Sequence, residues 1–106
     1  MITGAIYIGR DNSLDFHLTE DGEVVDLAPV SRMTLDLRGR GLPSVAIDSD
    51  QQPQAFDWQS DATRLKLKLG AHVNQPGEYL GRLTVFSLDH PHGLVWTEAL
   101  PVPVRA

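Results

Sequence analysis

Two histidines one residue apart, His90 and His92, form the cluster in this sequence with the clearest capacity for chemistry. Asp89 precedes them, so two imidazoles and one carboxylate lie within a stretch of four residues. A protein site for zinc or a related ion needs a third or fourth ligand within reach. Pro91 and Gly93 favour a simpler interpretation, an exposed turn between two strands. We therefore expect neither a metal ion nor a cofactor at this cluster.

A second candidate cluster, the acidic motif Asp48-Ser49-Asp50, resembles the beginning of a calcium-binding loop. The glycine and the distal bidentate glutamate of an EF-hand are absent at the required spacing. We interpret the motif as part of a solvated acidic loop. It opens segment 48–64, the most polar part of the chain, which predicts a loop between short strands.

Other groups with acid, base or nucleophilic capacity have no evident partners in the sequence. The carboxylates that could in principle serve acid and base catalysis are Asp11, Asp15, Glu20, Glu23 and Glu98. His17 falls on a polar face and His72 in a loop. Neither a G-x-S-x-G elbow nor a glycine-rich phosphate loop is present. We expect that the protein is not an enzyme.

Composition limits the partners that the chain can have. The 106 residues carry a formal net charge of −5 and no cysteine, which excludes disulfides and thiolate metal clusters. An acidic chain opposes binding to nucleic acid, because counterion release needs clustered basic residues. The single basic run, Arg64, Lys66 and Lys68, alternates with leucines and predicts the solvated face of a strand. Neither a signal peptide nor a membrane span is recognisable, so we expect a cytoplasmic protein without membrane contact.

The elements that must position these groups are strands, because apolar residues alternate with polar ones about every ten residues between Gly, Pro, Asn and Asp breaks. The predicted strands are 5–9, 13–18, 23–27, 31–39, 44–48, 54–58, 64–69, 78–88 and 94–104. The first two could form one bulged strand. We predict an all-β fold, an antiparallel sandwich of about seven to nine short strands, formed by residues 1–106 as a single domain.

Turn-forming residues predict several of the connections between these strands. Asp21-Gly22 predicts a tight hairpin, because glycine accepts the positive φ of primed turns. Gln75-Pro76-Gly77 predicts a corner that leads into the long strand 78–88. Pro101 and Pro103 lack backbone donors, which predicts that strand 94–104 lies at a sheet edge or leaves its pairing there.

Three aromatic residues have specific expectations. The hydroxyl of Tyr79 is placed to close the corner onto nearby backbone, as in sandwich folds. Trp96 is expected to fill the space between the sheets. Trp58 lies among polar residues; packing over the end of the sandwich is the commoner fate of such a residue, and the alternative is an exposed ring that serves as a protein contact or a platform for a sugar.

The order of these signals resembles a known family. Asp21-Gly22 is followed by the hydrophobic-Asp-Leu step Val25-Asp26-Leu27 and the alternating strand from Met33 to Leu37. The second half has Gly77 and Tyr79 at the start of a long strand, then Gly93 and Thr97. Over residues 13–104 the chain is similar to immunoglobulin-like β-sandwich domains of phage virions, particularly the N-terminal domain of phage upper baseplate proteins. It departs from them in its lead, AIYIGRDN, its paired prolines and its lack of a C-terminal extension.

The resemblance implies a non-enzymatic virion structural protein, assembled in many copies in the host cytoplasm. Baseplate, tail, neck and head decoration positions all remain open. Its partners would be other virion proteins and copies of itself, with strand 94–104 or the lead 5–9 adding to a neighbour's sheet. Two alternatives are a carbohydrate-binding or adhesive module, motivated by Trp58 and the acidic loop, and a small regulatory protein that acts by surface contact.

Overall fold

The alternating sequence forms mainly β-strands joined by turns in residues 4–106, the part of the chain that the computed structural model describes. The strands are β1 (Ile6–Tyr7), β2 (Leu14–Phe16), β3 (Thr19–Glu20), β4 (Glu23–Val24), β5 (Arg32–Arg38), β6 (Val45–Asp48), β7 (Phe56–Asp57), β8 (Leu65–Leu67), β9 (Gly77–Phe86) and β10 (Leu94–Arg105). A single 3-10 turn, η1 (Pro53–Ala55), precedes β7. The prediction of an all-β fold is confirmed. Within the described part of the chain no helix has the length and hydropathy needed to span a membrane.

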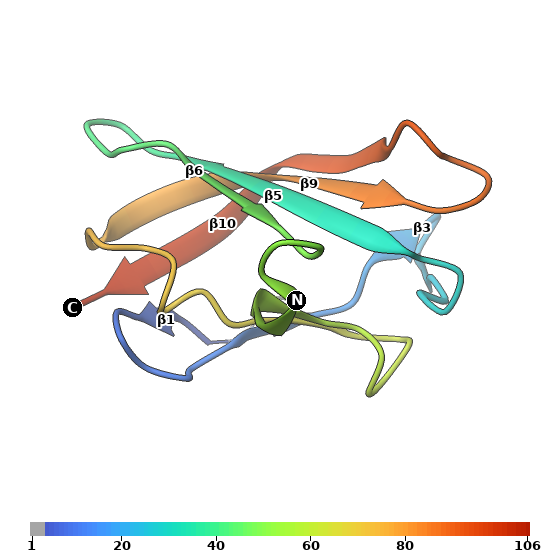
Figure 1. Cartoon of the computed structure of the whole chain (residues 1–106), viewed down its shortest axis with the longest axis horizontal. Helices are drawn as coiled ribbons and strands as arrows, with labels where there is room; N and C mark the ends of the chain where they lie inside the picture. The colour runs from blue at the N-terminus through green and yellow to red at the C-terminus, as the bar shows by residue number, and fades with distance from the viewer. Residues whose placement is uncertain (1–3) are drawn as a thin grey trace.

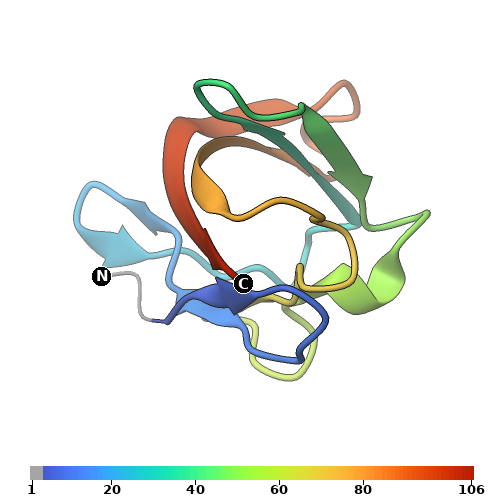
Figure 2. The ribbon, with the colours of Figure 1, turned by 90° about the vertical axis from the view of Figure 1, so that its left-hand side faces the viewer.

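The strands form two main sheets that lie face to face (Figures 1 and 2). The larger sheet has the order β1-β10-β9-β5-β6, the smaller one the order β2-β8-β7, and β3 and β4 pair as a separate hairpin. All neighbours are antiparallel except β1 and β10, which run parallel. The prediction of an antiparallel sandwich was therefore wrong for this pair, because β1 lies beside β10 and runs in the same direction.

The first two predicted strands are not one bulged strand, as the sequence had allowed. β1 belongs to the larger sheet and β2 to the smaller one. Gly9 has a φ of +75° between them, and the amide of Arg10 donates to the carbonyl of Tyr7 at 3.0 Å. Residues with a side chain rarely adopt this positive φ. The turn at Gly9 carries the chain from the larger sheet to the smaller one.

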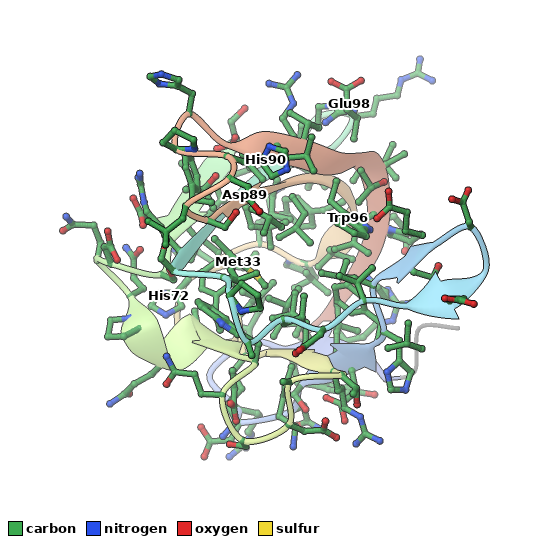
Figure 3. All side chains as sticks on the ribbon, turned by 90° about the vertical axis from the view of Figure 1, so that its right-hand side faces the viewer. Met33, His72, Asp89, His90, Trp96 and Glu98 are labelled. Carbon is green, nitrogen blue, oxygen red and sulfur yellow. The ribbon has the colours of Figure 1, made fainter. Side chains whose placement is uncertain are left out.

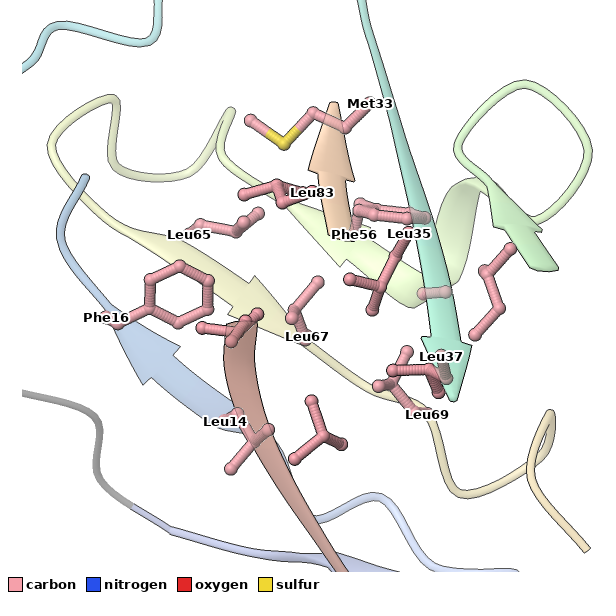
Figure 4. Packing of buried hydrophobic residues seen from close by; sticks show 14 of the residues in the cluster. Leu14, Phe16, Met33, Leu35, Leu37, Phe56, Leu65, Leu67, Leu69 and Leu83 are labelled. Atoms are coloured by element: carbon pink, nitrogen blue, oxygen red, sulfur yellow. The ribbon is translucent and has the colours of Figure 1, made fainter. Parts of the chain in front are cut away.

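One hydrophobic cluster fills the space between the two sheets (Figure 4). The larger sheet contributes Met33, Leu35 and Leu37 from alternate positions of β5, and the smaller one contributes Leu65 and Leu67 from β8, all fully buried. Each such side chain stabilises the fold by about 1.5–3 kcal/mol relative to an exposed one. The alternating positions that the sequence indicates are the positions that face the core.

The hairpin predicted at Asp21-Gly22 is confirmed, although the structure adds β3 as a strand that the sequence did not indicate. Asp21 and Gly22 have φ values of +53° and +82°, the signs that a type I′ turn requires. The turn places Glu20 directly opposite Glu23. Two like charges at this position oppose each other, and both side chains are exposed to solvent.

The prediction that the last strand lies at a sheet edge or leaves its pairing at the prolines was wrong, because β10 lies between β1 and β9 and stays paired with β9 through both prolines. Pro101 and Pro103 stand opposite Leu80 and Glu78 of β9. The carbonyl of Arg105, two residues beyond Pro103, accepts from Ile8 at 3.0 Å on the side away from β9. Because backbone groups alternate along a strand, the missing donors of both prolines fall on that same side. The prolines are tolerated there because their missing donors face away from β9, on the side where β1 pairs with β10 at residues 104 and 105.

Tyr79 forms the corner that the sequence predicts. Its side chain is buried, and its hydroxyl donates to the carbonyl of Gln75 at 2.7 Å. The bond ties the start of β9 to the connection from β8, the point at which the chain crosses from the smaller sheet to the larger one. Burial raises the pKa of the phenol above its ordinary value.

Candidate docking surface

The histidine cluster lies in the turn between β9 and β10, at one end of the molecule (Figure 3). His90 and His92 are exposed, and reciprocal backbone hydrogen bonds between Ser87 and His90 hold the turn. Within residues 4–106, no three side chains of the His, Cys, Asp and Glu types gather in a geometry that could hold a metal ion. The interpretation of an exposed turn is confirmed.

The motif at Asp48 and Asp50 faces a cation, but that cation is an arginine of the same chain. Arg32 of β5 donates from its Nε to Asp48 at 3.0 Å and from its Nη2 to the other oxygen of the same carboxylate. The same Nε lies 3.5 Å from Asp50, and the guanidinium stacks 4.6 Å from the centroid of the Phe86 ring. The hydrogen bonds from Arg32 hold the pKa of Asp48 below its ordinary value.

The prediction of a merely solvated acidic loop is therefore corrected. Asp48 is half-buried at the end of β6, and its backbone amide donates to the side chain of Gln52 at 3.0 Å. The neighbouring Ser49 is buried and accepts a hydrogen bond from the amide of Met33. The motif closes the end of the larger sheet, and the partner that makes this possible, Arg32, lies sixteen residues away in sequence.

Of the carboxylates considered for catalysis, only Glu20 and Glu23 are neighbours among the described residues, as exposed side chains opposite each other in a hairpin. Glu20 and Glu23 belong to the β3–β4 hairpin, and Glu98 of β10 lies 3.2 Å from Arg82. Asp15 of β2 accepts from the hydroxyl of Ser13 and stands opposite Lys66 of β8. Each carboxylate thus interacts with its own surroundings in the fold.

Asp11 and His72 line an open pocket of about 490 Å³ between the β1–β2 turn and the segment that follows β8. Arg10, Lys68 and Asp57 add charges of both signs to its wall. Among the candidate residues of the sequence, the structure brings only Asp11, His72 and Lys68 together here.

The outer face of the smaller sheet is polar. His17 of the segment after β2 is exposed, and its Nδ1 contacts the carbonyl of Thr63. Lys66 stands between Asp15 on one neighbouring strand and Asp57 on the other, so a positive charge lies between two negative ones. Arg64 and Lys68, the residues on either side of β8, are exposed as well. The prediction that the basic run forms a solvated strand face is confirmed.

The outer face of the larger sheet is different, and we call it the docking face. Leu80 of β9 and Val95 of β10 keep 43% and 48% of their surface exposed on it. Pro101 stands opposite Leu80, and Thr84 stands opposite Val95. Tyr7 of β1, opposite Arg105, is also 40% exposed on this side. The charged side chains of the face are Arg32, Asp36, Arg38, Asp48, Glu78, Arg82, Glu98 and Arg105.

One end of the docking face is hollowed into an open groove of about 540 Å³. Leu80, Tyr79 and Pro101 form its apolar part, and Arg38, Arg40 and Glu78 border it. Apolar side chains at a rigid surface with charges around them are typical of a protein contact.

Trp58 is buried, and Trp96 is only partly buried. Trp58 is only 6% exposed, and its indole N–H donates to the carbonyl of Val30 at 3.3 Å. It cannot present a ring face to a sugar, so the interpretation as an exposed platform was wrong. The segment before β5, which carries Val30, lies beside Trp58. It is held there by the amide of Leu27, which donates to the carbonyl of Ala62 at 2.8 Å. This contact joins residues far apart in sequence.

Trp96 packs against the core without becoming part of it, which corrects the prediction that it fills the space between the sheets. The pairing of β10 with β9 shifts register between Val95 and Thr97, so Trp96 occupies a bulge. A bulge re-aims the side chain that it contains. Figure 3 shows the Trp96 ring beside β10, on the side where the β3–β4 hairpin lies.

Sequence reasoning missed Leu80 and Val95 as surface residues. A signal for Leu80 was present, because it has the same parity along β9 as Glu78 and Arg82, which must face solvent. No comparable signal exists for Val95, since its direction depends on the register before the bulge.

Comparisons of this chain with protein-family models, with curated proteins and with solved structures gave no match.

Proposed function

We propose that this protein is a non-enzymatic structural protein of a phage virion and that it acts by docking through its larger sheet. The observation that carries the proposal is the docking face itself, where Leu80 and Val95 stay exposed on a sheet whose opposite side is fully buried. Leaving such side chains in water has a cost that a binding partner removes.

The strand order supports an immunoglobulin-like sandwich. In such domains one sheet contains strands B, E and D and the other contains G, F, C and, in variable-type domains, C′. The orders β2-β8-β7 and β10-β9-β5-β6 reproduce these two sets in the sequence order that the fold requires. The bond from Tyr79 to Gln75 adds the corner that is found near the start of strand F in these domains.

The virion role is supported by the resemblance of residues 13–104 to phage baseplate domains, through the Asp21-Gly22 turn, the Val25-Asp26-Leu27 step and the start of the long strand at Gly77. Structural proteins of symmetric particles act in many copies, so a contact of modest strength suffices. A sheet face that carries both apolar and charged side chains is suited to such repeated contacts.

We propose docking through the face rather than through strand addition. The lead strand β1 already pairs with β10 of its own chain, so its backbone on that side is occupied. Pro101 and Pro103 remove donors from the side of β10 that faces away from β9, which weakens any added ladder. The expectation that the lead or the last strand augments a neighbour's sheet gives way to this proposal.

The test is light scattering coupled to size-exclusion chromatography, with the purified protein mixed with purified head and tail proteins. A complex with a defined virion component is expected. Leu80→Asp should abolish it, whereas His17→Asp, which adds the same charge to the polar face, should leave it intact. Equal binding by both variants, or the absence of any complex, would contradict the proposal.

The carbohydrate-binding alternative was motivated by Trp58 and the acidic loop, but Trp58 is buried and Asp48 of the loop is paired with Arg32. We therefore propose no second function.

A further inference from the structure

We infer that the pocket between the β1–β2 turn and the segment after β8 binds a small organic phosphate, held by Arg10 and Lys68. This site is separate from the docking face, because none of its lining residues belongs to that face. The inference therefore goes beyond the proposed function and does not depend on it.

Arg10 and Lys68 bring two cations without a carboxylate partner to the wall of this pocket. The ion pairs among residues 4–106 all involve arginines of the larger sheet. Neither Arg10 nor Lys68 takes part in them, and both side chains are exposed. The chain as a whole carries −5, so a pair of unmatched cations in one pocket is a local excess of positive charge. Such a place attracts anions that the rest of the surface repels.

Two carboxylates also line the pocket, but one of them is engaged elsewhere. The two carboxylate oxygens of Asp57 accept from the hydroxyl of Ser60 at 3.0 and 2.9 Å, and one of them also accepts from the Ser60 amide at 3.2 Å. Ser60 does not line this pocket; it lines a smaller hollow beside it, together with Asp57. Asp11 is thus the carboxylate that remains, against the two cations Arg10 and Lys68.

Backbone hydrogen bonds hold the walls of the pocket together. The amide of Gly9 donates to the carbonyl of Gly70 at 2.8 Å, which ties the β1–β2 turn to the segment after β8. The amide of Lys68 donates to the carbonyl of Ala55 at 2.9 Å, which ties that segment to η1. A Cβ at Gly70 would lie 2.3 Å from the carbonyl oxygen of Arg10, so the turn packs directly on this glycine. Because the backbone is already ordered, binding has little conformational entropy to overcome.

The size and the lining of the pocket select the class of ligand. Its volume of about 490 Å³ lies within the roughly 300–1,000 Å³ that is typical of sites for small molecules. A phosphate monoester is close to a dianion at neutral pH, so it can meet both cations, whereas a monocarboxylate carries a single charge. Arginine offers a planar fork to phosphate oxygens, and lysine adds a point charge. Gln54 and Gln59 supply amide donors and acceptors for hydroxyl groups on the remainder of the molecule.

NMR titration tests the site with two probes, inorganic phosphate and glycerol 3-phosphate, at constant pH and ionic strength. His72 lines the pocket, so its ring resonances should shift and reach saturation. His90 and His92 lie exposed in the turn between β9 and β10 and should not respond in this way. Glycerol 3-phosphate should bind more tightly than inorganic phosphate, because its hydroxyl groups also reach the wall.

Charge-removing variants identify the residues that bind. Arg10→Gln and Lys68→Gln should each weaken binding by about tenfold or more, since each removes a charged hydrogen-bond donor. Arg64→Gln removes the same charge from an exposed residue outside the pocket and should leave binding unchanged. Thermal melts without phosphate establish that the variants fold. At ten times the wild-type Kd, glycerol 3-phosphate should raise the wild-type melting temperature by about 5 °C, and the shift should be smaller in Arg10→Gln and Lys68→Gln.

Several results would overturn the inference. Shifts of equal size at His72, His90 and His92 that never saturate would mean that phosphate acts only as a general electrolyte. A loss of binding in Arg64→Gln as large as in Lys68→Gln would mean that overall charge, rather than the pocket, holds the anion. Acetate that binds as tightly as glycerol 3-phosphate would overturn the assignment of a phosphate. Leu80→Asp should bind phosphate normally, so this inference and docking through the larger sheet succeed or fail separately.

Discussion

The two sheets enclose the same core but present different surfaces to solvent. On the smaller sheet, the outward positions of β2, β8 and β7 form a row in which Lys66 lies between Asp15 and Asp57. On the larger sheet, the corresponding outward positions include Leu80 and Val95, both about half exposed. The same alternation thus produces one outer surface that is polar and one that keeps apolar side chains exposed.

The difference indicates how the two sheets divide their roles. The smaller sheet is built from strands of two and three residues, and it depends on connecting segments that pack tightly around it. The larger sheet contains three long strands of seven, ten and twelve residues, with the shorter β1 and β6 at its edges. Substitutions should therefore cost more stability in the segments around the smaller sheet than in equivalent positions of the larger one.

The largest difference is expected between the two tryptophans. Trp58→Ala should lower the free energy of unfolding by about 3–5 kcal/mol, because it empties a buried site and removes the bond to Val30. Trp96→Ala should cost about 1–2 kcal/mol, since the ring is partly exposed in its bulge. Urea unfolding of both variants measures the difference. A larger loss for Trp96 would reverse the comparison.

Two glycines provide the next test. An alanine Cβ at Gly70 would lie 2.3 Å from the carbonyl oxygen of Arg10 and 2.6 Å from that of Tyr7, so the backbone itself must move. At Gly81 of β9 the nearest atom is the end of the Leu35 side chain, at 2.8 Å, which can rotate away. We expect Gly70→Ala to cost about 2–3 kcal/mol and Gly81→Ala about 1 kcal/mol. Equal thermal shifts would show that the smaller sheet is not the more tightly constrained region.

The strands of the larger sheet were predictable from sequence to within one or two residues, because alternation is a local property. The predicted 31–39 and 78–88 became Arg32–Arg38 and Gly77–Phe86, and the turn at Asp21-Gly22 formed as expected. The parallel pairing of β1 with β10 was not predictable, because nothing local in residues 5–9 indicates a partner almost a hundred residues away.

The candidate surface was less predictable than the strands. The burial of Trp58 depends on a distant segment that carries Val30, and the partial exposure of Trp96 depends on a bulge. The ion pair of Asp48 with Arg32 also joins separate strands. Sequence reasoning identified the turn of His90 and His92 correctly, since Pro91 and Gly93 are local signals.

A smaller effect is expected at the corner that joins the sheets. Tyr79→Phe removes the bond to Gln75 and should cost about 1 kcal/mol. Burial raises the folded-state pKa of Tyr79 above its ordinary value near 10.0, so stability that is present below that pH is lost as the pH rises through the folded-state pKa. The wild-type protein should lose more stability than the variant above pH 10. If wild type and Tyr79→Phe lost the same stability as the pH rises, the Tyr79 phenol would not be the source of the alkaline loss.

The smallest effect is expected at the ion pair of the docking face. The pKa of Asp48 lies below its ordinary value near 3.8, mainly because Arg32 donates hydrogen bonds to it. Its contribution to stability is therefore present above that pH and is lost as the pH falls through the folded-state pKa. The stability difference between wild type and Asp48→Asn should be largest near neutral pH and should vanish toward pH 2.

A residual acid dependence should remain in Asp48→Asn. Hydrogen bonds from Ser60 and Thr63 also hold the pKa values of Asp57 and Asp61 low, and both residues lie beside the smaller sheet. A variant with no acid dependence at all would indicate that Asp48 alone governs unfolding at low pH.

The parallel pairing of β1 with β10 has a mechanical consequence. Tension that pulls residues before β1 and after β10 apart would act along the two strands, so their bonds, including that from Ile8 to Arg105, are sheared together rather than opened in sequence. Behind this contact lies the much longer pairing of β10 with β9, from Leu94 to Val104. The chain therefore resists stretching first at its ends, and the core between the sheets stays closed until that contact slips.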